Sequence, residues 1–70
     1  MTTYRVAIPE TCDIHGLSLE EAELLVREYL ADEAVIPFWF KTSRGIRSCL
    51  YRDKNLTKVL AQIDAEDFWG

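Results

Sequence analysis

Residues 35–52 have the sequence VIPFWFKTSRGIRSCLYR, two runs of β-branched and aromatic residues on either side of a glycine. Alternation with a period of two within each run is typical of β-strands. Ser43, Arg44 and Gly45 fit a three-residue hairpin loop with the glycine in the left-handed conformation. The stretch therefore predicts a β-hairpin around which the rest of the chain is organised.

The predicted hairpin has two faces that both carry large apolar side chains. With the three-residue loop, one face carries Phe38, Phe40, Ile46 and Leu50. The other carries Trp39, Cys49, Tyr51, Lys41 and Arg47. A two-residue loop would exchange these neighbours, because register fixes which side chains share a face. Pro37 has no amide hydrogen to donate, so we expect its strand at a sheet edge or at a bulge.

Two further elements are expected before the hairpin. Residues 3–8 alternate apolar and polar side chains, which predicts a half-buried strand that ends at Pro9, followed by a loop over residues 10–16. Ser18 and Glu21 have the spacing of a capping box, so a helix is expected to begin there and to run to about residue 32 or 33.

A second helix is expected after the hairpin. Asp53 or Asn55 can cap it, and one helical stripe is predicted to hold Leu56, Val59, Leu60 and Ile63. The predicted fold is a small two-layer α+β domain over residues 1–70, in the order β-α-β-β-α. Its three-stranded sheet has the second hairpin strand in the centre, and both helices cover the Phe38 and Phe40 face.

The size of the chain indicates that it does not bury all of its apolar surface. A single domain of 70 residues, of which 49% are hydrophobic, buries only about 60% of the surface that its unfolded chain exposes. We therefore expect self-association as a homodimer or a protein partner.

Charge is distributed unevenly along the chain. The net charge is −4, but residues 1–40 hold two basic and eight acidic side chains, whereas residues 41–58 hold six basic and one acidic. An acidic half of the chain and a basic hairpin can attract an anionic partner to the hairpin or pair two copies of the chain head to tail.

No pattern in the sequence indicates an enzyme, a metal site or a cofactor site. Cys12, His15 and Cys49 are the only thiol and imidazole groups, and a closed zinc site needs four ligands. A Cys12–His15 nucleophilic pair has no predicted orienting group or pocket. The acidic residues of the helix are expected on a solvated face, where they are unsuited to acid-base catalysis.

A cytoplasmic location is expected for this chain. Its first residues do not form an apolar signal segment, and no run of residues has the length of a membrane span. In that compartment two cysteines are expected to be reduced thiols.

The predicted function is that of a non-enzymatic protein-interaction module. Its partner-binding surface is predicted to comprise Trp39, Lys41, Arg44, Arg47 and Tyr51, with the acidic helix face as a second surface. Small chains of this kind suit regulators or inhibitors encoded by phages and mobile elements. The alternative is a nucleic-acid-binding protein that uses the basic hairpin region 41–58, with aromatic rings stacking on bases. A purely structural alternative is that Trp39 and Tyr51 close a second small core under Phe68 and Trp69.

Overall fold

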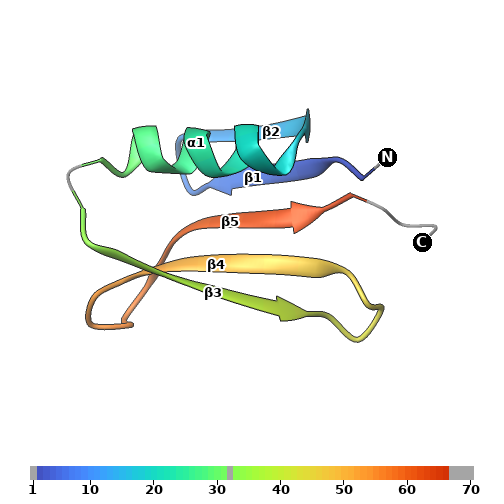
Figure 1. The fold of residues 1–70 in the computed structure, drawn as a ribbon. Coiled ribbons are helices and arrows are strands. Elements are labelled where there is room, and N and C mark those ends of the chain that lie inside the picture. The colour runs from blue at the N-terminus through green and yellow to red at the C-terminus, as the bar shows by residue number, and fades with distance from the viewer. Residues whose placement is uncertain (1, 32, 67–70) are drawn as a thin grey trace.

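The computed structural model describes residues 2–31 and 33–66, which form one sheet and one helix (Figure 1). Along the chain, the elements are β1 (Tyr4–Ile8), β2 (Cys12–Leu17), α1 (Leu19–Tyr29), β3 (Val35–Lys41), β4 (Arg47–Asp53) and β5 (Val59–Ala65). The five strands have the spatial order β2-β1-β5-β4-β3, and every neighbouring pair is antiparallel. The prediction of a three-stranded sheet with two helices is therefore wrong.

The helix begins as the sequence predicts. Ser18 Oγ accepts a hydrogen bond from the Glu21 amide (3.1 Å), and the Glu21 carboxylate accepts one from the Ser18 amide (2.9 Å). This reciprocal capping box satisfies two amides that have no partner within the helix. Ala22 and Val26 form the buried stripe, and α1 packs with it on β1, β2 and β5.

The hairpin of β3 and β4 confirms the predicted loop and register. The Thr42 amide donates to the Ile46 carbonyl (2.8 Å), and Gly45 between them has a φ of +78°, a conformation that glycine adopts without strain. Trp39 pairs with Cys49, and Phe38 pairs with Leu50. The strand that contains Pro37 lies at the edge of the sheet, as predicted.

The segment expected to be a loop before the helix contains β2, which pairs with β1 along the other edge of the sheet. The register shifts after Tyr4, so that His15 and Gly16 together lie opposite the single residue Arg5. This bulge, with Gly16 at a φ of +74°, interrupts the alternation that marks a strand.

The segment expected to be the second helix is β5, which lies between β1 and β4 (Figure 1). Asp53 caps the turn that precedes β5 and does not cap a helix. Its carboxylate accepts hydrogen bonds from the Thr57 amide (2.7 Å), the Lys58 amide (3.1 Å) and the Thr57 hydroxyl (2.6 Å). Ala61, Ile63 and Ala65 alternate inward from β5, which completes the core.

The helix lies on the opposite side of the sheet from the predicted one, and it packs on β1, β2 and β5 and not on the hairpin. Val6, Ile63 and Cys49 are fully buried on the side of the sheet that carries α1, and Trp39 and Tyr51 pack against this core on the same side. The physical reason is β5, which supplies small and branched side chains to that face and the polar Gln62 and Asp64 to the other. Phe38 and Phe40 therefore lie on the face without a helix.

Candidate functional site

Three of the five residues predicted to bind a partner come together on the helix side of the hairpin. The guanidinium of Arg47 lies over the indole of Trp39, with its central carbon 4.8 Å from the ring centroid. Lys41 pairs directly with Arg47 across the strands, and Trp39, Phe40, Lys41 and Arg47 line a shallow hollow of about 190 Å³. We call Trp39, Lys41 and Arg47 the basic surface.

The basic surface contains a like-charge pair that costs stability. Two cations directly opposite each other on neighbouring strands repel. Within residues 2–31 and 33–66, neither Lys41 nor Arg47 forms an ion pair with a carboxylate. The arrangement is therefore suited to an anionic group from outside the described fold.

The other two predicted residues lie apart from this cluster or below it. Arg44 is exposed in the hairpin loop, where its amide donates to the Thr42 hydroxyl (3.3 Å). Tyr51 is half-buried against the core, and burial raises its pKa to about 12. The neighbouring Cys49 thiol is fully buried, and desolvation raises its pKa as well. Tyr51 therefore contributes more to packing than to a contact surface.

The face without a helix carries apolar side chains, among them Phe38, Phe40 and Leu50, for which the sequence predicts a position under the helices. Phe38 is 56% exposed and Ile36 is 43% exposed. The rings of Phe38 and Phe40 stack with their centroids 5.8 Å apart, and Leu50 is the cross-strand partner of Phe38. We call Ile36, Phe38, Phe40 and Leu50 the open apolar face. The polar alternation of Gln62 and Asp64 is the sequence signal that could have shown this face to be uncovered.

The same face of the sheet is polar over β1, β2 and β5. Arg5 donates two hydrogen bonds to Asp13 (2.8 and 2.7 Å) and lies 3.5 Å from Asp64. Asp64 in turn accepts from the hydroxyl of the buried Ser48 (2.6 Å) and from Gln62 (2.9 Å). The hydrogen bonds from Arg5 hold the pKa of Asp13 below its usual range.

His15 connects this polar network to the end of β5. Its Nδ1 lies 2.7 Å from the Glu66 carboxylate, and its Nε2 lies 3.3 Å from Asp13. Glu66 also accepts from the Gly16 amide (2.8 Å), and these contacts, with the amide as the larger cause, lower the pKa of Glu66. The network satisfies polar groups locally, so this half of the face is suited to water.

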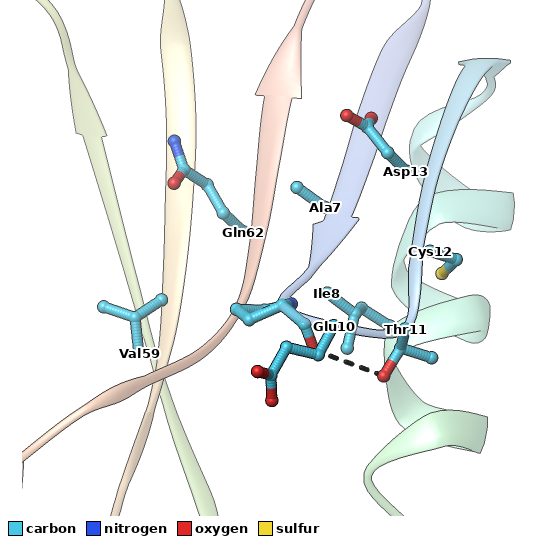
Figure 2. Close-up of a pocket in the computed structure, with 9 residues that line it drawn as sticks. Ala7, Ile8, Glu10, Thr11, Cys12, Asp13, Val59 and Gln62 are labelled. Carbon is cyan, nitrogen blue, oxygen red and sulfur yellow. Dashed lines mark hydrogen bonds between the residues drawn. The ribbon is translucent and has the colours of Figure 1, made fainter.

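A wider hollow of about 470 Å³ lies on this face at the turn between β1 and β2 (Figure 2). Gln62 and Asp13 border it on either side of Ala7, and the turn residues Glu10 and Thr11 close one end. The Thr11 hydroxyl donates a hydrogen bond to the Pro9 carbonyl (3.3 Å). The hollow is broadly open, and we find no convergent set of catalytic groups among the side chains that line it.

The thiol and imidazole groups do not form a metal site. His15 is exposed, whereas Cys49 is fully buried in the core and Cys12 is half-buried against it. Among the described residues, no group of three or more histidine, cysteine or acidic side chains could hold a metal ion.

Comparisons with protein-family models, with curated proteins and with solved structures find no match to this chain. A search of the described residues for a helix long and apolar enough to cross a membrane also finds none. The structural alternative, in which Phe68 and Trp69 close a second core over Trp39 and Tyr51, depends on residues outside the described part of the chain.

Proposed function

We propose that this chain is a small non-enzymatic protein-interaction module that acts as a regulator or inhibitor and binds its partner through the β3–β4 hairpin. The observation that carries the proposal is the exposure of Phe38, a large aromatic residue that is 56% exposed in a strand of a packed sheet. Ile36 is exposed beside it on the same face. Large contiguous apolar patches on a protein surface mark interaction sites.

The open apolar face can contribute substantial binding energy. A phenylalanine side chain has roughly 200 Å² of surface, so covering the exposed half of Phe38 removes about 100 Å² from water. At about 25 cal/mol per Å², this single contact stabilises a complex by up to about 2.5 kcal/mol. Ile36, Phe40 and Leu50 add area around it, in the arrangement of an interface hot spot.

The partner is expected on the faces of the hairpin and not along its edge. The Thr42 amide points toward β4, where it donates to Ile46. Because the backbone N–H and C=O groups of successive strand residues point alternately to the two sides of a strand, those of residue 37 point to the free edge of β3. Proline at that position offers no amide to an added strand, and the exposed Lys41 further disfavours strand addition.

A nucleic-acid ligand has less support than a protein. The cations of the basic surface favour phosphate contacts, but Arg47 already covers one face of the Trp39 ring. Tyr51 is half-buried, so it offers little ring surface for a base. Single-strand binding surfaces depend on accessible aromatic rings as stacking platforms.

Affinity capture from the native lysate, with and without nuclease, tests the proposal. The baits are the unmodified chain, Phe38→Glu and the matched control Leu56→Glu, which changes an equally apolar residue that is 55% exposed in the turn before β5. The proposal predicts a partner that resists nuclease, is retained by Leu56→Glu and is lost with Phe38→Glu. Loss of the partner on nuclease treatment, or its retention by Phe38→Glu, contradicts the proposal.

A further inference from the structure

The helix covers only part of its side of the sheet. Strands lie about 4.8 Å apart, so five strands span about 24 Å, whereas a helix with its side chains covers about 10 Å. In Figure 1, α1 lies along β1 and β2, and β4 and β3 lie at the far side of the sheet. The contacts of α1 are with β1, β2 and β5, so the basic surface at the loop end of the hairpin lies beside the helix and not under it.

The outer face of α1 carries the opposite charge. Helical geometry places Glu20, Leu24 and Glu28 opposite the buried Ala22 and Val26. Leu24 is 53% exposed, and the helix surface around it has a hollow of about 300 Å³ lined by Glu20, Glu23, Leu24 and Arg27. This acidic outer face with an apolar centre complements the basic surface, in which the guanidinium of Arg47 lies over Trp39.

We propose that two copies of this chain pair reciprocally, with the outer face of α1 in each copy covering the basic surface of the other. The inference rests on the proposed function, because it assigns a second copy of the chain as one protein partner of the hairpin. Glu20 and Glu28 of one copy then neutralise Lys41 and Arg47 of the other, and Leu24 contacts Trp39. The like-charge pair of Lys41 and Arg47 is stabilised by this contact.

A second copy fits the site better than an unrelated anion. A two-fold axis brings each surface of one copy onto the complementary surface of the other, so both halves of the contact form at once. One chain carries both surfaces on the same side of its sheet, which is what a closed pair requires. The open apolar face remains outside this contact and is free for another partner.

Charge reversal in pairs tests the reciprocal contact. One variant carries Lys41→Glu and Arg47→Glu, and the other carries Glu20→Lys and Glu28→Lys. The molar mass of each is measured by light scattering over a dilution series at low salt. The matched controls are Lys54→Glu with Lys58→Glu and Glu10→Lys with Glu33→Lys, which make the same charge changes at exposed positions away from both surfaces.

The unmodified chain and both controls are expected to be dimers. Each reversal should weaken self-association by about 100-fold or more, because it places like charges across both halves of the contact. An equimolar mixture of the two reversed variants should form a heterodimer, since each surface then meets its opposite charge. Thermal unfolding of each variant confirms that it is folded, and glutamine substitutions at the same positions replace any variant that is not.

Three results would overturn the inference: an unmodified chain that is monomeric throughout, a dimer that both reversals leave intact, or reversed variants that do not combine. None of these results affects the lysate capture with Phe38→Glu, because Phe38 lies on the other face of the sheet. Conversely, a dimer that survives Phe38→Glu and responds to the reversals supports the reciprocal contact even if no other partner is captured.

Discussion

The two halves of the sheet use their surfaces differently. Over β1, β2 and β5, one face is buried under α1 and the other is a network of hydrogen bonds and ion pairs around Arg5 and Asp64. Over β3 and β4, the helix side carries Trp39 with the cations Lys41 and Arg47, and the opposite side carries Phe38. The first half therefore holds most of the core, and the second half, besides burying Cys49, also exposes large side chains such as Phe38.

Truncation of the core in the covered half is expected to have the largest effect. Ile63 is fully buried in β5 between β1 and β4, so Ile63→Ala should lower the free energy of unfolding by about 2 to 5 kcal/mol. A domain of this size has only about 3 to 5 kcal/mol in total. Circular dichroism at 25 °C should therefore show a largely unfolded variant. A loss below about 1 kcal/mol would contradict the assignment of β5 to the core.

Truncation on the helix side of the hairpin should have an intermediate effect. Trp39 is half-buried and packs against the edge of the core, so Trp39→Ala should cost roughly 2 kcal/mol, about half the cost of removing a fully buried ring. Urea unfolding of Trp39→Ala and of the matched Trp39→Phe measures this cost. If Trp39→Ala is as destabilising as Ile63→Ala, the hairpin belongs to the core and the contrast between the halves fails.

The capping box, the hairpin with its register and the edge position of Pro37 could all be predicted from sequence. Each depends on local chemistry, such as the reciprocal bonds of Ser18 and Glu21 or the left-handed glycine at position 45. Three of the five predicted binding residues also lie close together, because they share one face of that hairpin.

The strands β2 and β5 could not be predicted from local signals alone. In β2, the bulge at His15 and Gly16 interrupts the alternation after Cys12 and Ile14. In β5, the spacing of Val59 and Ile63 fits a helix as well as a strand, and the position between β1 and β4 decides in favour of the strand. Because β5 determines which face of the sheet is buried, the prediction of a helix in place of β5 also reverses the predicted exposure of Phe38 and Trp39.

A smaller effect is expected from the polar network, and only in acid. The Gly16 amide and His15 hold the pKa of Glu66 below its usual value of 4.5. The ionised carboxylate therefore stabilises the fold above about pH 4.5, and this contribution is lost as the pH falls through the lower folded pKa. Between about pH 5 and pH 3, the thermal midpoint should fall more steeply for the unmodified chain than for Glu66→Gln. Equal slopes would show that the network does not contribute to stability.

The smallest effect on stability is expected at the residue that carries the functional proposal. Urea unfolding of Phe38→Thr tests most directly whether the open apolar face belongs to the fold or to a contact surface. Because Phe38 is 56% exposed and threonine suits a strand, the free energy of unfolding should change by no more than about 0.5 kcal/mol. A loss of about 2 kcal/mol or more would show that Phe38 is buried in the folded chain, and would contradict the account of the hairpin as a binding surface.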